Sequence, residues 1–318
     1  MSFTFLGTGS YTPDKIVTNQ EVSTIVDTSD EWIMKRIGVR QRYVSVDESA
    51  ADMGVKAAKK ALEDAETDPA DLDLIIASTI SSDTVCPGVA CMVQKELGVS
   101  CPAFDVAAAC TGFLFMLEIA AGYFSRGMVK KVLLVSGERM SGVLDWTDRA
   151  TCCIFGDGAG AVVLGEGDSY LYSCFDTRGG DEVLSVPVYS DRSPFYKKEL
   201  KPAAVQMNGQ ETYKFAVTTM SANILRVLEM AGLKPEDMAA VIPHQANYRI
   251  INEARKRVPG IPPERFHVNI ENYGNTSSAS VPILLDEVKR SGAFRRGDYI
   301  ILVAFGGGLS SGACLVRW

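Results

Sequence analysis

The 318-residue sequence is poor in the features that mark several protein classes. It contains only two histidines, and none of its eight cysteines forms a C-x-x-C pair, so a zinc site is not expected. Residues 1–15 lack a basic start followed by an apolar run, which argues against a secretion signal and a disulfide framework. We therefore expect a cytoplasmic protein whose thiols are free.

Two kinds of partner are also not expected. The net charge of −7 argues against a general affinity for nucleic acid. The most apolar stretch, residues 113–124, contains Glu118 and is too short to span a membrane, so it is predicted to form a buried helix. An apolar content of 47% and a charged content of 22% are typical of a globular protein with one large domain or two ordinary ones.

The second half of the sequence repeats the first. Residues 62–76 and 228–242 share Leu-Glu, a proline, an aspartate and two aliphatic residues at a constant offset of 166 (228 − 62). Further on, Cys110 aligns with Asn275 at an offset of 165 (275 − 110), and residues 132–135 align with 299–302 near that spacing. Gly160 and Gly312 begin matching final strands. Four such matches in one order predict a duplicated supersecondary unit.

Hydrophobic patterning predicts alternating helices and strands in both copies. Ser49 and Asp52 form a capping box for a helix that ends near Pro69. Strands are expected at 72–79, 103–106, 129–137 and 159–164 in the first copy, with a helix from Thr111. The second copy is expected to have helices at 213–231 and from Asn247, and strands at 239–243, 299–304 and 312–317.

This alternation predicts an α/β fold with two sheets related by a pseudo-twofold axis. We assign the two halves to residues 1–170 and 171–318. The polar, turn-rich residues 187–202 are predicted to link them.

Cys110 is the leading candidate for a nucleophile. It lies between an expected strand and an expected helix, next to small residues that allow a sharp turn. A thiol at a helix N-terminus is favoured as the thiolate because the free N–H groups stabilise negative charge. The alternative is an ordinary buried cysteine, and the pairing with Asn275 favours the nucleophile.

Three other features could complete a site with Cys110. His244 follows a repeated strand at its C-terminal end, where ligand sites assemble in α/β sheets, whereas His267 is expected to be structural. Asn275 could be a helix N-cap or a site residue. The glycines at 306–308 could form a simple turn or a loop whose N–H groups approach an oxyanion.

Together these segments resemble β-ketoacyl-acyl-carrier-protein synthase III of the thiolase-like superfamily. The resemblance rests on Cys110 in DVAAACTG, His244 in HQAN, Asn275 in NYGNTSS and the terminal FGGGLSSGACLVRW, and it extends from the first strand to Trp318. It implies a duplicated, five-layered αβαβα fold, a homodimer and no permanently bound cofactor.

The resemblance also implies the reaction. Cys110 would accept an acyl group from acyl-coenzyme A and then transfer it, in a decarboxylative condensation, to malonyl-acyl-carrier protein. The product would be a 3-oxoacyl-carrier protein, and the step would initiate fatty acid synthesis. Cys110, His244 and Asn275 would form the catalytic triad, with Gly307 in the oxyanion hole and Phe305 beside the malonyl group.

Further site residues are implied by the same resemblance. Trp32 and Arg149 would hold the adenine of coenzyme A between them. Arg36, Thr28 and Asn247 would contact the rest of the coenzyme A molecule. Cys86 takes the place of a bulky aromatic that closes the acyl pocket in some relatives, so longer or branched starters could enter. The basic residues expected to dock the acidic carrier protein are Lys214, Arg249, Lys256 and Arg257.

Several rival families fit less well. A thiolase is expected to have a second cysteine shortly before its terminal glycines, where this chain has Val303, Ala304 and Phe305. Elongating synthases place a histidine where this chain has Asn275, and two other relatives with a similar cysteine, hydroxymethylglutaryl-coenzyme A synthase and plant-type polyketide synthases, are longer. A non-catalytic carrier-binding scaffold is expected to lack a member of the triad. The sequence leaves open which acyl starter is preferred. It also leaves open whether the protein serves fatty acid synthesis or polyketide synthesis.

Overall fold

Two mixed sheets form the frame of the molecule, and the computed structural model describes residues 2–187, 194–195, 197 and 202–318. In both sheets a parallel pair is extended by an antiparallel neighbour. The first sheet has the order β1 (Ser2–Tyr11), β7 (Gly158–Gly167), β6 (Lys131–Glu138), β4 (Leu74–Ser78) and β5 (Ala103–Val106). The second has the order β11 (Met238–Pro243), β12 (Tyr299–Gly306), β13 (Ser310–Arg317) and β8 (Tyr170–Thr177).

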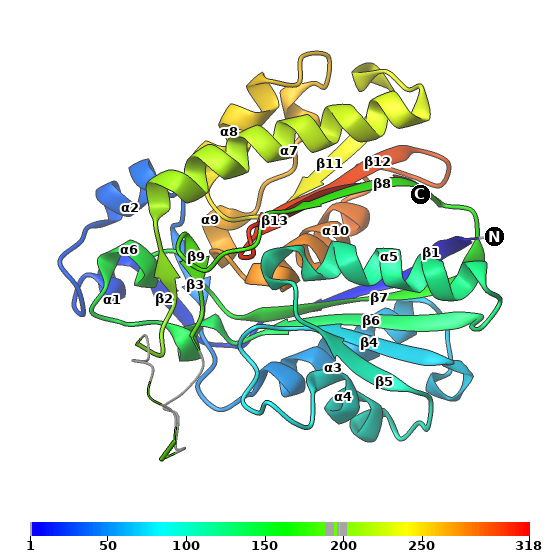
Figure 1. Cartoon of the computed structure of the whole chain (residues 1–318), viewed down its shortest axis with the longest axis horizontal. Helices are drawn as coiled ribbons and strands as arrows, with labels where there is room; N and C mark the ends of the chain where they lie inside the picture. Colours follow the sequence, from blue (N-terminus) through cyan, green and yellow to red (C-terminus); the bar gives the residue numbers. More distant parts are fainter. Residues whose placement is uncertain (1, 188–193, 196, 198–201) are drawn as a thin grey trace.

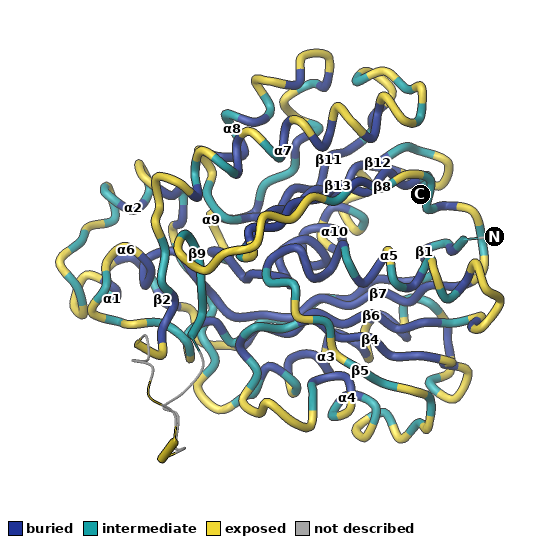
Figure 2. The backbone as a smooth tube through the Cα atoms, in the orientation of Figure 1, coloured by how far each residue is buried: buried dark blue, intermediate teal, exposed yellow. Residues whose placement is uncertain are grey.

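Helices cover both sheets and fill the space between them (Figure 1). α3 (Ala50–Asp64) and α4 (Val89–Leu97) cover the outer face of the first sheet, and α7 (Gly209–Ala231) and α8 (Tyr248–Lys256) lie over the second. α5 (Gly112–Ser125) and α10 (Ser280–Arg290) lie between the sheets and contact both. The predicted five-layered αβαβα fold is thus confirmed, and Figure 2 shows that its inner layers are the most deeply buried.

Small residues bring α3 close to β1. A Cβ atom on Gly9 would lie 2.4 Å from the backbone nitrogen of Ala61, and one on Gly7 would lie 2.4 Å from that of Ala65. Such distances are far inside van der Waals contact, so only glycine fits at these two positions of the strand. Ala57 and Ala61 of α3, and Ala65 directly after it, recur every four residues and face the strand.

Strand pairing confirms most of the predicted duplication. Ile75 pairs with Leu133 in the first sheet, and Val241 pairs with Ile301 in the second. This agrees with the predicted offset of 166 for β4 and β11. Gly160 and Gly312 also take equivalent positions in β7 and β13, because their partners are Ser136 and Ala304.

The predicted alignment of Cys110 with Asn275 is wrong by three residues. A short 3-10 helix, Ala109–Thr111, precedes α5, and its equivalent before α10 is Ser277–Ala279, so the offset here is 168 (277 − 109). Both turns place a non-glycine residue at positive φ, +46° for Ala109 and +49° for Ser277. The counterpart of Cys110 is therefore Ser278. The offset has grown because the second copy carries an extra short helix, α9 (Ile270–Tyr273), before this turn.

Other expectations differ from the structure in smaller ways. β6 and β12 also correspond at 168 (299 − 131), so Val132 matches Ile300 rather than Tyr299. The strand at 103–106 has the predicted bounds, whereas β1, β8, α4 and α10 were not predicted. Most of the expected link at 187–202 lies outside the described residues, and the division of the chain at residue 170 stays a prediction. Among the helices that are described, none is long and apolar enough to cross a membrane.

Candidate active site

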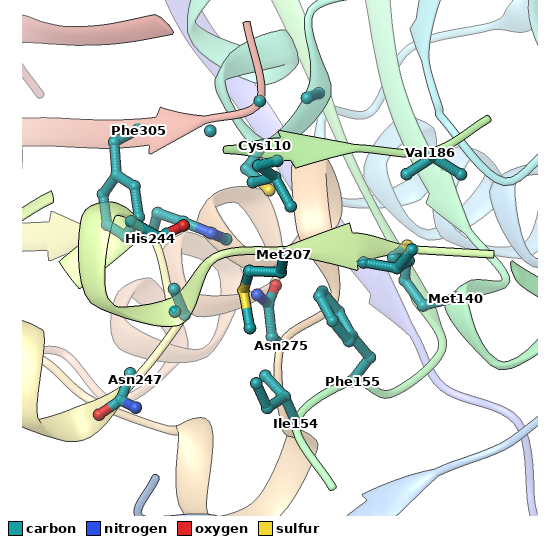
Figure 3. A pocket seen from close by; sticks show the side chains of 18 of the residues that line it. Cys110, Met140, Ile154, Phe155, Val186, Met207, His244, Asn247, Asn275 and Phe305 are labelled. Atoms are coloured by element: carbon teal, nitrogen blue, oxygen red, sulfur yellow. The ribbon is translucent and has the colours of Figure 1, made fainter. Parts of the chain in front are cut away.

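A cavity of about 590 Å³ lies where the two copies meet, and both contribute to its wall. Cys110, His244 and Asn275 line it together, although they come from three separate segments of the chain (Figure 3). Phe305, Gly306 and Gly307, at the end of β12, form another part of the wall. The sequence prediction that these residues share one site agrees with this arrangement.

Cys110 lies in a strained turn at the start of α5. Ala109, directly before it, has a positive φ of 46°, which is unusual for a residue with a side chain. The end of β12 packs against this turn, and a Cβ atom on Gly306 would lie 2.8 Å from the Cys110 nitrogen. Glycine is therefore required at 306 for the two backbones to approach each other.

The prediction of a resting Cys110 thiolate is wrong. Burial raises the pKa of this thiol to about 12, while a hydrogen bond with the Ser277 hydroxyl, 3.6 Å from Sγ, acts in the opposite direction. The negative Glu138 carboxylate raises the pKa further. Loss of solvent thus outweighs the favourable position at a helix N-terminus, and the thiol is protonated at neutral pH.

His244 is neutral and firmly held. It follows β11, donates its backbone N–H to the Val303 carbonyl at 2.8 Å, and is 1% exposed. Burial lowers the pKa of the imidazole to about 3, so the ring carries no charge at neutral pH. Its Nδ1 lies 2.6 Å from Ser280 Oγ, and its plane meets the Phe305 ring edge to face at a centroid distance of 5.3 Å.

Asn275 joins the two copies through its backbone and presents its side chain to the cavity. It donates its N–H to the Ile154 carbonyl at 2.9 Å, and its own carbonyl accepts the Gly156 N–H at 3.1 Å. The side-chain Oδ1 accepts the Ser277 N–H at 2.8 Å. Because the oxygen is engaged in this way, the NH₂ group is the end available to a ligand.

Three of the residues predicted to bind coenzyme A line the cavity, namely Trp32, Arg36 and Asn247. The Arg149 guanidinium lies over the Trp32 ring, 4.9 Å from its centroid, and donates to the Asp27 carbonyl at 2.9 Å. The expected adenine partners are therefore neighbours, but they stack on each other and leave no gap. Thr28 is not part of the cavity wall, and its hydroxyl lies 3.9 Å from the Cys153 sulfur.

The remaining predicted residues lie outside the cavity. Cys86 is exposed on the segment before α4 and is not part of the wall in this chain. The four basic residues are exposed on α7 and α8 or at the end of α8. Three of them pair with glutamates on their own helices, Lys214 with Glu211, and Lys256 and Arg257 with Glu253. Arg249 instead stacks over the Tyr213 ring, 5.6 Å from its centroid, and Tyr213 lines the cavity.

Sequence reasoning missed the apolar wall and the two serines that contact Cys110 and His244. The wall comes from the long β6–β7 connection and from the ribbon of β9 (Leu184–Ser185) and β10 (Gln206–Met207), which crosses the cavity in Figure 3. Ser277 and Ser280 contact Cys110 and His244. The serine-rich run after Asn275 in the sequence could have pointed to these two serines. In the part of the chain that is described, no group of three or more His, Cys, Asp or Glu residues could hold a metal ion.

Comparisons with known proteins agree with one another. Two family models match, 3-oxoacyl-[acyl-carrier-protein] synthase III over residues 104–180 and its C-terminal model over residues 228–318. The β-ketoacyl-[acyl-carrier-protein] synthase III of Clostridium acetobutylicum is 45% identical, and the alignment covers 100% of this chain and 99% of the relative.

Solved structures are similar over the same extent. The crystal structure of 3-oxoacyl-[acyl-carrier-protein] synthase III from Aquifex aeolicus has a TM-score of 0.92 at 42% identity, covering 99% of this chain and 100% of that one. The priming β-ketosynthase of the R1128 polyketide pathway has a TM-score of 0.91 at 38% identity, covering 99% and 96%.

The raised pKa of Cys110 predicts a distinctive pH dependence of alkylation. Because the pKa lies far above neutrality, the thiolate fraction, and with it the rate of reaction with iodoacetamide, should rise about tenfold per pH unit between about pH 7 and pH 9. The rate is measured as mass gain on the Cys110 peptide. Free N-acetylcysteine, whose rate levels off above its pKa of about 8.5, serves as the control. A rate for Cys110 that levels off near neutral pH would contradict this assignment.

Proposed function

The chain belongs to the 3-oxoacyl-acyl-carrier-protein synthase III family of condensing acyltransferases, and we propose that it joins an acyl-coenzyme A starter to malonyl-acyl-carrier protein through Cys110. The observation that carries the proposal is the meeting of Cys110, His244 and Asn275 in one buried, largely apolar cavity. Relatives with 45% and 42% identity bear the synthase III name, so we assign the step to the start of fatty acid synthesis rather than to a polyketide pathway.

In the first half-reaction, the Cys110 sulfur attacks the thioester carbonyl of the acyl-coenzyme A. A new C–S bond forms to Cys110, the bond to the coenzyme A sulfur breaks, and the thiol proton leaves with coenzyme A, so the step is balanced. The backbone N–H groups of Cys110 and Gly307 are the donors we assign to the tetrahedral oxyanion. The Cys110 backbone and the end of β12 already lie within contact distance, so little reorganisation is needed.

In the second half-reaction, the malonyl group loses carbon dioxide and becomes an enolate. Neutral His244 and the Asn275 NH₂ group would donate hydrogen bonds to its thioester oxygen as negative charge develops there. One such preorganised donor is worth about 3–4 kcal/mol in other oxyanion holes. The enolate carbon then attacks the acyl carbonyl on Cys110, a C–C bond forms and the C–S bond breaks, and the released Cys110 thiolate takes up a proton from water. The Phe305 ring keeps this end of the cavity apolar.

The substrate would enter along the side of the cavity that carries Trp32, Arg36 and Asn247. Adenine binding between Trp32 and Arg149 requires the guanidinium to lift off the indole, since the two are in contact. The cation–π contact is worth about 0.5–1 kcal/mol at an exposed site, which a stacked adenine can replace. Thr28 is not part of the cavity wall and contacts the Cys153 sulfur, so its role would be to support the segment that follows Arg149 rather than to contact substrate.

We also propose a cytoplasmic homodimer that uses the β5 edge. β5 is the last strand of the first sheet, and Val89 and Ala90 at the start of α4 donate their N–H groups to Asp105 of that strand. The exposed segment with Cys86 leads directly into α4, so it lies near the same edge. Cys86 could therefore reach the acyl pocket of a partner subunit rather than its own.

Product formation tests the proposed reaction. Incubation with acetyl-coenzyme A and malonyl-acyl-carrier protein should yield 3-oxobutanoyl-carrier protein and carbon dioxide. The product is detected by mass spectrometry of the carrier protein. Cys110→Ala should abolish the product, because no other described thiol lines the cavity. Cys174→Ala, which removes a thiol of β8 that lies outside the cavity wall and away from the β5 edge, should leave the rate unchanged. Product formation by Cys110→Ala at the wild-type rate would refute the assignment of the nucleophile.

Carrier-protein docking is assigned to the basic surface of α7 and α8. We expect Arg249 to contribute most to the attraction of the acidic carrier protein, because the other three basic side chains already pair with glutamates. Replacing Arg249 and Lys256 by glutamate should raise the KM for malonyl-carrier protein about tenfold, roughly 1.4 kcal/mol, and spare acyl transfer from coenzyme A. The charge-matched control is Lys59→Glu with Lys130→Glu, on the first sheet's side of the molecule. Equal KM values for the two double variants would rule out this docking surface.

A further inference from the structure

Three serines in and directly after the turn that leads into α10 contact buried side chains of other segments. Ser277 Oγ lies 3.6 Å from the Cys110 sulfur. Ser278 donates its hydroxyl to the buried Glu138 carboxylate at 2.7 Å. Ser280, the first residue of α10, has its Oγ 2.6 Å from Nδ1 of His244. One short segment of the second copy thus orders both the nucleophile turn and the imidazole.

The hydrogen bonds around Ser280 determine where its single proton lies. Its Oγ accepts the backbone N–H of Gln245 at 3.3 Å and contacts His244 Nδ1 at 2.6 Å. No other partner of this hydroxyl is present among the described residues. If Nδ1 carried a proton, Ser280 would accept twice and its own buried O–H would have no acceptor, which costs about 1–3 kcal/mol. The hydroxyl therefore donates to Nδ1.

We infer that Ser280 is a positioning residue that holds His244 in the tautomer with its proton on Nε2. When one nitrogen of a neutral imidazole accepts a hydrogen bond, the other carries the proton and is a donor. Ser280 is 2% exposed, so water does not compete for Nδ1.

The backbone around His244 is fixed from two further directions, which keeps the ring in place. Gln245 donates its side-chain N–H to the Pro243 carbonyl at 2.7 Å. The same side chain accepts the N–H groups of Asn269 and Ile270 at 3.0 and 3.1 Å. His244 itself donates its backbone N–H to Val303. With the ring held, the choice of tautomer decides what it offers to the cavity.

The consequence for the reaction rests on the proposed function. In the Nε2–H tautomer, His244 offers a donor to the thioester oxygen of the malonyl group, where negative charge develops. In the other tautomer, a nitrogen lone pair would face that charge and repel it. Acyl transfer to Cys110 does not use this donor, so loss of Ser280 should slow the condensation and spare the acylation.

The tautomer can be read directly by nuclear magnetic resonance, because the chain has only two histidines. With nitrogen-15-labelled histidine, a long-range proton–nitrogen correlation spectrum shows which ring nitrogen carries the proton, and His267→Gln assigns the two rings. We expect Nε2–H for His244 in the wild-type protein and in Ser280→Thr, which keeps the hydroxyl. Ser280→Ala should shift His244 toward Nδ1–H or a mixture. A wild-type Nδ1–H signal, or no change in Ser280→Ala, would overturn the inference.

Kinetics give a second readout. Ser280→Ala should lower the condensation rate about 10- to 100-fold, the range seen when the hydrogen-bond partner that orients a metal-bound imidazole is lost, with acylation of Cys110 within about twofold of wild type. Ser278→Ala removes a neighbouring buried hydroxyl that does not touch His244, so its His244 spectrum should match wild type.

The nuclear magnetic resonance spectrum reports the tautomer of His244 whether or not the protein is an active synthase. It therefore tests the role of Ser280 independently of the proposed function. An inactive protein with the Nε2–H signal would refute the function and leave the role of Ser280 standing. If Ser280→Ala does not fold, the wild-type and Ser280→Thr spectra still test the inference, because an Nδ1–H signal for His244 in either protein would overturn it.

Discussion

The active site depends on the contact between two equivalent turns, one before α5 and one before α10. Each carries a non-glycine residue at positive φ, Ala109 in the first and Ser277 in the second. Strain of this kind costs about 1–3 kcal/mol per residue and persists only where the surrounding structure enforces it. Here the Ser277 hydroxyl meets the Cys110 sulfur, and Ser278 bonds to Glu138 of the first sheet. The duplicated fold thus places the two turns face to face beside the cavity, whose wall includes Cys110 and Asn275.

Burial then sets the chemistry. Both the thiol of Cys110 and the imidazole of His244 are uncharged at neutral pH, because removal from water penalises their charged forms. The buried Glu138 carboxylate, whose charge acts on Cys110, accepts hydrogen bonds from the hydroxyls of Thr79, Ser81 and Ser278. A neutral, apolar cavity suits an acyl chain, and it strengthens any fixed donor aimed at a developing enolate. The basic side chains proposed to dock the carrier protein lie outside this cavity, exposed on α7 and α8 or at the end of α8.

Sequence patterning predicted the duplicated α/β framework and the three residues that meet in the cavity, Cys110, His244 and Asn275, but not their environment. Apolar segments predicted the strands that precede Cys110 and His244, because backbone periodicity is a local property. The register of Asn275 was three residues off, since an inserted short helix does not interrupt the hydrophobic pattern. The charge state of Cys110 was predicted in the wrong direction, because desolvation depends on distant segments such as β12 and the β9–β10 ribbon. The role of Ser280 rests on one hydroxyl proton, which no sequence pattern records.

The central claim is that the two copies divide the reaction, Cys110 taking the acyl group and His244 with Asn275 activating the malonyl group. Intact-protein mass spectrometry on wild type and on the double variant His244→Ala, Asn275→Ala tests this most directly. Both proteins should gain one acyl group from acyl-coenzyme A, and only the wild type should lose it when malonyl-carrier protein is added. A double variant that is never acylated, or one that discharges its acyl group as fast as wild type, would contradict the division of roles.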